Sequence, residues 1–89
     1  MAEIIATEEL LDNVATLTSP KVREKVQSAL TAIATFPESG SKDVPESVRR
    51  HFSDSVMKAY APPFDFVYYY EKEADKVYAL GLVHFRQAR

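Results

Sequence analysis

The last residues of the chain, ALGLVHFRQAR (79–89), join an apolar run to side chains that can bind an anion. His84 lies near the end of the apolar run, and Arg86 and Arg89 follow it. Because a guanidinium forms paired hydrogen bonds and an imidazole titrates near neutral pH, these side chains could form a phosphate or carboxylate site. Simpler interpretations stay open: the arginines could be a solubilising tail, and His84 could be a packed, hydrogen-bonded histidine.

A second group of basic residues, Arg49, Arg50 and His51, is the densest basic run in the chain. Such a run is typical of a solvated edge, and the alternative is a contact with RNA or with a partner protein. The tyrosines at 68–70 alternate sides on a strand, so at least one belongs to the core, and base stacking by another is a weaker alternative. The chain has no cysteine, which excludes a thiolate zinc site. We predict no metal and no cofactor.

The composition predicts one small domain spanning residues 1–89. Hydrophobic residues make up 46% of the chain, which is typical of a globular protein and not of a disordered one. The net charge of −2 argues against a domain whose main task is to bind nucleic acid, although it leaves room for a local basic patch. No segment approaches the ~20 apolar residues that span a bilayer, and no signal peptide is evident, so we expect a cytoplasmic protein with no membrane contact.

Apolar spacing and turn residues predict the element order β-α-α-β-β-β. Thr7 is a candidate N-cap, and Ser19 followed by Pro20 marks the start of a second helix, which Pro37 ends. Residues 37–47 form a loop, while 48–52 could be a short helix or the lead into a strand. The other predicted elements are a strand at 3–7, a helix beginning at 8, and strands at 55–60, 64–72 and 77–85.

The last predicted strand is apolar on both faces, which indicates a central position in the sheet. The fold class is therefore α+β, with a helical hairpin packed on one face of a small antiparallel-rich sheet. We expect the other face to be open and to hold the functional site. Strict alternation places Val77, Ala79, Gly81, Val83 and Phe85 on one face and Tyr78, Leu80, Leu82 and His84 on the other.

This layout resembles the RelE/ParE superfamily of bacterial toxins, the toxic halves of type II toxin–antitoxin modules. SPKVREKVQSALTAIATFPE (19–38) is similar to the family's second helix and the loop after it. VMKAYAPPFDFVYYYEKEADKVYALGLVHFRQ (56–87) resembles its three-strand meander, with an aromatic-rich strand, an acidic hairpin and a strand ending in His-x-Arg. The likeness covers nearly the whole chain and lies in the pattern as a whole.

The resemblance implies a growth-inhibiting toxin with a cognate antitoxin. RelE-like members enter the ribosome and cut mRNA, whereas ParE-like members inhibit DNA gyrase, and the short first helix here looks more like the RelE branch. Family antitoxins wrap the toxin with an extended segment that folds on binding. Acidic antitoxin side chains would then pair with Arg86 and Arg89, and exposed apolar residues such as Tyr60 and Phe64 would anchor the segment.

The family's catalytic residues carry over only in part. The resemblance aligns Lys58 with a family lysine and Arg86 with the C-terminal arginine, and both would bind the phosphate of the cleaved RNA. His84 would be the acid or base in place of a C-terminal tyrosine, which is absent. A second family lysine aligns with Val56, and an arginine aligns with Asp65, whose charge would repel a phosphate. Lys58 could equally be an ordinary surface lysine.

These points lead to hypotheses from different classes. The first is a toxin that cleaves mRNA on the ribosome as an endoribonuclease, with weakened activity. The second is a non-catalytic binder, either a gyrase inhibitor or a degenerate toxin that binds only its antitoxin. Asp65 and the acidic net charge favour the second hypothesis. A third reading is a small α+β interaction domain without toxicity.

Overall fold

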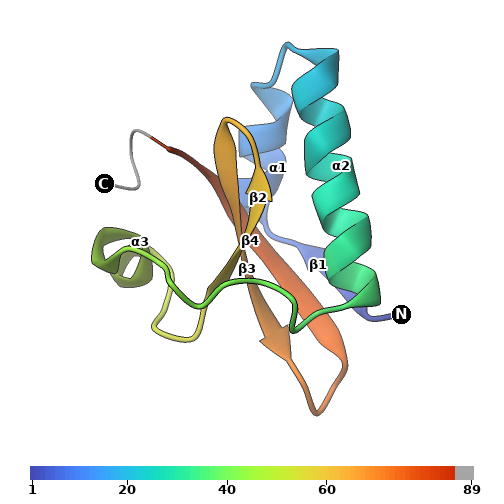
Figure 1. The fold of residues 1–89 in the computed structure, drawn as a ribbon, viewed down its shortest axis with the longest axis vertical. Coiled ribbons are helices and arrows are strands. Elements are labelled where there is room, and N and C mark those ends of the chain that lie inside the picture. The colour runs from blue at the N-terminus through green and yellow to red at the C-terminus, as the bar shows by residue number, and fades with distance from the viewer. Residues whose placement is uncertain (86–89) are drawn as a thin grey trace.

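The structure is a computed structural model that describes residues 1–85 (Figure 1). The sequence-based predictions for Arg86 and Arg89 lie outside these residues. The described elements are β1 (Glu3–Ala6), α1 (Glu8–Ala15), α2 (Pro20–Thr35), α3 (Glu46–His51), β2 (Met57–Ala61), β3 (Phe64–Glu71) and β4 (Lys76–His84).

The strands form one sheet in the order β1-β4-β3-β2. β1 runs parallel to β4, while β4 with β3 and β3 with β2 are antiparallel. The predictions of an α+β class and of a central last strand are therefore confirmed. The helices α1 and α2 lie together on one face of the sheet (Figure 1), which we call the helical face.

Both hairpin helices begin where the sequence predicts. The Thr7 hydroxyl accepts a hydrogen bond from the Leu10 N–H at 3.3 Å, and the Ser19 hydroxyl accepts one from the Val22 N–H at 3.4 Å. These caps satisfy N–H groups that the first turn of a helix leaves unpaired. Phe36, at the C-cap of α2, leaves helical geometry with φ −130° and ψ 76°, and its side chain is 67% exposed.

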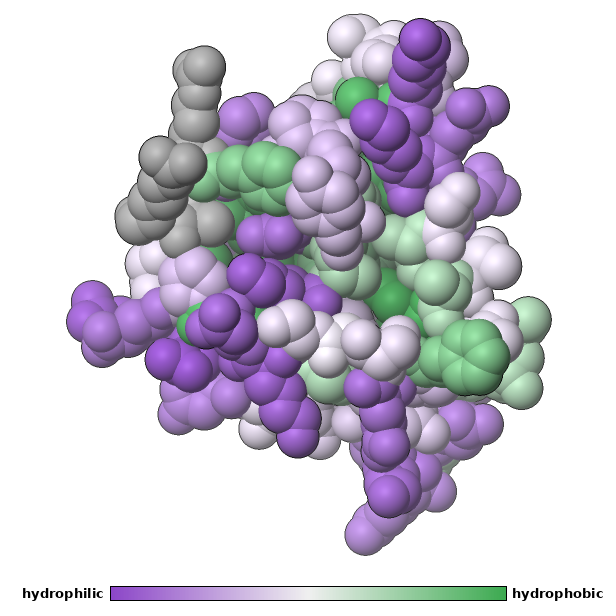
Figure 2. Space-filling model, in the orientation of Figure 1, coloured by the Kyte–Doolittle hydropathy of each residue, from purple (hydrophilic) through white to green (hydrophobic). Residues whose placement is uncertain are grey.

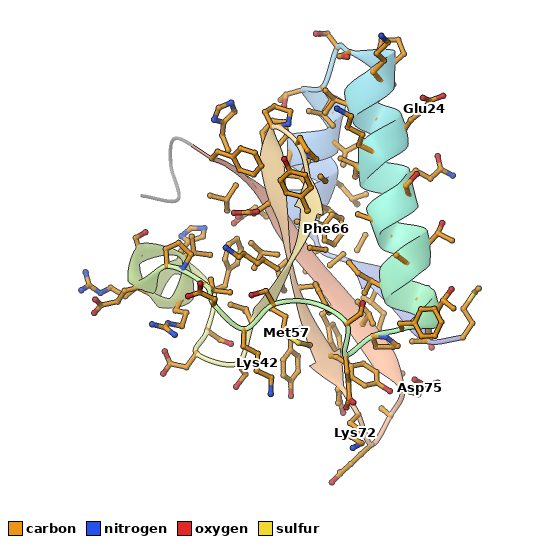
Figure 3. The ribbon with its side chains drawn as sticks, in the orientation of Figure 1. Glu24, Lys42, Met57, Phe66, Lys72 and Asp75 are labelled. Carbon is orange, nitrogen blue, oxygen red and sulfur yellow. The ribbon has the colours of Figure 1, made fainter. Side chains whose placement is uncertain are left out.

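The main core lies between the helical face of the sheet and the two helices α1 and α2. Phe66 and Tyr68 on β3 are fully buried there, and Ile33 of α2 packs in the same cluster. In Figure 3, Phe66 lies between the sheet and α2. Further members of this core are Leu10, Leu17, Val26, Ala29, Met57, Ala61, Val77, Ala79 and Leu82.

The second face of the sheet, which we call the α3 face, is not open as expected. The ambiguous residues 48–52 form most of α3, which places Val48 over the sheet beside Val44 and Val56. These valines form a separate small core with Val67 of β3 and with partly buried Phe52, Leu80 and Val83. The alternating apolar residues of β3 and β4 need this cover, because each strand is buried on both faces.

Strict alternation along β4 is also wrong, because the strand bulges. Val67 is paired with Gly81 and Tyr68 with Ala79, so Leu80 has no partner of its own in the register. An extra residue in a strand moves the side chain of every later residue to the opposite face of the sheet. Leu82 therefore joins Val77 and Ala79 in the main core, instead of sharing a face with Leu80.

Beyond the end of β1, Thr7 and Asn13 form hydrogen bonds with the backbone along the outer edge of β4. The Thr7 N–H donates to the Ala79 carbonyl at 3.0 Å, and the Thr7 hydroxyl lies 3.0 and 3.1 Å from the carbonyls of Ala79 and Leu80. Farther along, the Leu82 N–H donates to Asn13 Oδ1 at 3.0 Å. Side chains of the helix thus satisfy backbone groups that a longer β1 would otherwise pair.

Candidate functional site

Lys58 lies on the α3 face, near the middle of the edge strand β2. It is paired with Val67, whose side chain packs in the small core on that face. The Lys58 backbone is fixed on both sides, because it also exchanges two hydrogen bonds of 2.9 Å with Ser41 of the preceding loop. No carboxylate within residues 1–85 lies within 4.0 Å of its ammonium group. The geometry leaves this cation available to an anion.

Asp65 lies on the same face as Lys58. Its cross-strand partners are Tyr60 on β2 and Val83 on β4. The Tyr60–Asp65 pair is two residues along the strands from the Lys58–Val67 pair. Side chains at such diagonal positions are within reach of each other in an antiparallel sheet. A half-buried carboxylate here would repel a phosphate that approaches Lys58.

Tyr60 also lies on the α3 face and is 73% exposed. Its ring stacks on Phe85, with centroids 5.6 Å apart and planes 13° apart. Tyr60 is the exposed member of this pair and Phe85 is half-buried, and an exposed aromatic ring suits the predicted role of Tyr60 as an anchor for a partner.

His84 and Phe64 lie on the other side of the sheet. They are a cross-strand pair, with ring centroids 5.4 Å apart in an edge-to-face arrangement, and Phe64 packs against the main core. The structure therefore does not bring His84 together with Lys58, although the resemblance places both in one catalytic site. The bulge in β4 produces this separation.

The basic run lies on α3, whose outward side chains are hydrophilic (left in Figure 2). Two of its members already have partners: Arg50 binds Glu46 at 2.8 Å, and His51 lies 3.2 Å from Glu9 of α1. These exposed pairs contribute little stability, about 0–1 kcal/mol each, and an anionic ligand could displace them. Arg49 is half-buried, and the structure gives it no ion pair within residues 1–85.

Sequence reasoning missed the contacts that hold this region together. The Tyr68 hydroxyl donates to the Pro37 carbonyl at 2.8 Å and accepts from the Gly40 N–H at 2.9 Å, which fixes the loop that carries Ser41. Burial raises the pKa of Tyr68 above its usual value of 10.0, partly offset by the Gly40 N–H, so the hydroxyl remains a donor at neutral pH. The available signal was Gly40, the one glycine in the loop at residues 37–47.

Gly81 marks a second missed contact. A methyl group at this position would lie 3.0 Å from the Phe52 ring and 3.2 Å from oxygens of Asn13 and Glu9. Here α1, α3 and β4 meet, and the contact between the Glu9 carboxylate and the His51 ring joins the two helices across the meeting point. A glycine inside a strand is a usual sign of a bulge or a close approach, and both occur at this site.

The described side chains of the α3 face offer charge and aromatic stacking. No group of histidines, cysteines or carboxylates within residues 1–85 is arranged to hold a metal ion. Across the same residues, no helix has the length and apolar character needed to cross a membrane. The α3 face combines the cation of Lys58, the basic run of α3 and the exposed ring of Tyr60, interrupted by the carboxylate of Asp65.

Comparison by sequence finds no relative: no protein-family model and no curated protein matches the chain. Solved structures do match. A chain in the crystal structure of the intact E. coli RelBE toxin–antitoxin complex superposes with a TM-score of 0.71 and 16% identity, over 94% of this chain and 96% of that chain. The isolated E. coli RelE toxin gives a TM-score of 0.70 and 16% identity, over 94% of this chain and 84% of that chain. The protein therefore has the RelE fold.

Proposed function

We propose that this chain is the toxin of a type II toxin–antitoxin module. The observation that carries the proposal is the likeness of fold to the E. coli RelE toxin, both isolated and in the RelBE complex, over 94% of the chain. The RelBE complex supports an antitoxin as the partner. The exposed ring of Tyr60, stacked on Phe85, supports the α3 face as part of the surface that this antitoxin covers.

Expression of the chain without an antitoxin should arrest bacterial growth. The measurement is the optical density and viable count of a culture after induction from a tightly repressed promoter. Where a short reading frame beside the gene encodes an antitoxin, its co-expression should restore growth, because a bound antitoxin would cover the active surface. Continued growth of cells that contain the soluble, folded chain would contradict the toxin proposal.

For the mechanism of arrest, we propose cleavage of mRNA on the ribosome. Lys58 supports this mechanism, because it lies on the edge strand β2, is partly exposed, and has no ion-pair partner among the described residues. The phosphate contact that Lys58 would supply stabilises charge that develops as the RNA strand is cut. Arg86 remains a proposed second cation on the basis of the resemblance.

Replacing Lys58 by alanine should lower mRNA cleavage about 10²-fold while the fold is retained, since a lost transition-state contact typically costs 10²–10³ in rate. Arg86→Ala should act in the same direction. Primer extension on mRNA from arrested cells measures the cuts, and Lys25→Ala on the exposed side of α2 is the matched control. Cleavage that survives both Lys58→Ala and Arg86→Ala would remove this site assignment.

A second candidate is a toxin that acts by binding alone, with DNA gyrase as one target. Asp65 supports it, because its carboxylate lies on the same face as Lys58 and opposes a phosphate there. The position of His84 also supports it, because the proposed acid or base lies on the helical face. Growth arrest without cuts in mRNA would favour this candidate, and a gyrase supercoiling assay would then test its target.

A further inference from the structure

A recess on the α3 face lies toward the turn between β3 and β4, and its lining residue Tyr69 is a diagonal neighbour of Lys58 across β2 and β3. It has a volume of about 560 Å³, and we call it the tyrosine pocket. The residues that line it are Phe52, Ser53, Ser55, Tyr69, Glu71, Tyr78 and Leu80. Apart from Tyr69, one of the tyrosines for which base stacking was a weaker alternative, none of them was predicted to bind a ligand, and neither proposed mechanism of arrest uses them.

The floor of the tyrosine pocket is a pair of stacked rings. Tyr69 on β3 and Tyr78 on β4 are cross-strand partners, with centroids 6.1 Å apart and planes 24° apart. Tyr69 is 36% exposed, so one face of its ring is available to a ligand. Such a face carries partial negative charge and attracts cations.

One carboxylate is fixed at the rim. The Tyr78 hydroxyl donates to Glu71 Oε2 at 3.0 Å, which holds the carboxylate beside the rings. This hydrogen bond is the main reason that the pKa of Tyr78 is raised, so the tyrosine remains a donor at neutral pH. The other oxygen of Glu71 has no hydrogen-bond partner within the part of the chain that the structure describes.

A second carboxylate lies near the rim. Glu3 is close enough to the Tyr78 hydroxyl to raise its pKa. Lys76 is the opposing cation: it is paired in register with Glu3 and Glu71, yet it forms no ion pair with either within 4.0 Å. Two carboxylates, Glu71 and Glu3, therefore lie beside the single cation of Lys76 at this end of the strands.

We propose that the tyrosine pocket binds an arginine side chain that a partner protein presents on an extended segment. A guanidinium is planar and weakly hydrated, so it can stack on the free face of Tyr69 and donate to the free oxygen of Glu71. The apolar walls formed by Phe52 and Leu80 suit the aliphatic stem of the arginine and an apolar neighbour in the segment. This inference goes beyond the proposed function and does not depend on it.

The probe for this test is the tripeptide acetyl-Leu-Arg-Leu-amide, titrated into the ¹⁵N-labelled full chain and followed by amide chemical shifts. We expect saturable shifts confined to residues 52–55, 69–71 and 78–80. The citrulline tripeptide, which keeps the shape but lacks the charge, should bind at least about fivefold more weakly, a difference of about 1 kcal/mol. Acetyl-arginine-amide should also bind more weakly, because it lacks the flanking leucines.

Variants of the pocket provide the controls. Glu71→Gln and Tyr69→Leu should each lower the affinity for the Leu-Arg-Leu tripeptide by a factor similar to that of the citrulline change. The dispersion of amide signals in the same spectra reports whether each variant is folded. Glu73→Gln removes an equal charge from the exposed turn nearby and should leave binding unchanged. Three results would each contradict arginine binding in the pocket: shifts that do not saturate, a citrulline peptide that binds as tightly as the arginine peptide, or a Glu73→Gln variant that loses as much affinity as Glu71→Gln. If acetyl-arginine-amide bound as tightly as the tripeptide, the proposal that the arginine comes on an extended segment would be wrong.

Discussion

Replacing Phe66 by alanine should lower the free energy of unfolding by about 3–5 kcal/mol, as measured by urea denaturation. Phe66 has no exposed surface and lies between the sheet and α2, so its removal leaves a cavity that rigid neighbours on both sides cannot close. A protein of this size has a total stability of roughly 4–13 kcal/mol, so the loss removes a large part of it. We expect a much lower denaturation midpoint with little change in the slope of the transition.

Phe36→Ala is the matched control for this experiment. It removes the same side chain from a position that is 67% exposed, and it should change the free energy of unfolding by less than about 0.5 kcal/mol. If the two alanine variants lost equal stability, the packing described for the helical face would be wrong.

Replacing Gly40 by alanine should cost about 2–4 kcal/mol of stability. A methyl group at this position would run into the hydroxyl and the ring of Tyr68, which is fully buried. Overpacking of this kind costs about 1–3 kcal/mol, and the displaced hydroxyl would lose hydrogen bonds to Pro37 and Gly40 worth about 0.5–1.5 kcal/mol each. Urea denaturation of Gly40→Ala and of the wild type measures the difference.

The source of that cost can be isolated by a double-mutant cycle with Tyr68→Phe. Since phenylalanine lacks the hydroxyl, Gly40→Ala should cost less in the Tyr68→Phe background, and the difference should be at least about 0.5 kcal/mol. Ser39→Ala, an exposed neighbour on the same loop, should be nearly neutral. Strict additivity of Gly40→Ala and Tyr68→Phe would contradict a direct contact.

The parts of the fold that follow from local pattern were predictable. Thr7 and Ser19 lie at the caps of α1 and α2 because capping depends on residues close in the sequence. The central place of β4 followed from its apolar residues on both faces. Residues 48–52 stayed ambiguous, since a helix this short is stabilised by the packing of Val48 on the sheet and not by its own propensity.

The composition of the candidate site was less predictable, for a physical reason. Lys58 and Tyr60 lie two residues apart on β2, which pairs with β3 without a register shift. His84 was paired with them through the resemblance, but the bulge near Leu80 turns it to the helical face. A bulge depends on how two strands meet, and the only local sign was Gly81, which has several possible causes.

The contact between Asn13 and the edge of β4 has a consequence for the solubility of the folded chain. β4 is the most apolar strand, and the half that extends past β1 would present a free backbone edge to other molecules. Exposed apolar edges promote pairing between chains and hence aggregation. Because the Asn13 amide occupies the Leu82 N–H, a helix protects the sheet from this pairing. One side chain on α1 therefore helps to keep neighbouring copies of the protein from joining sheet to sheet.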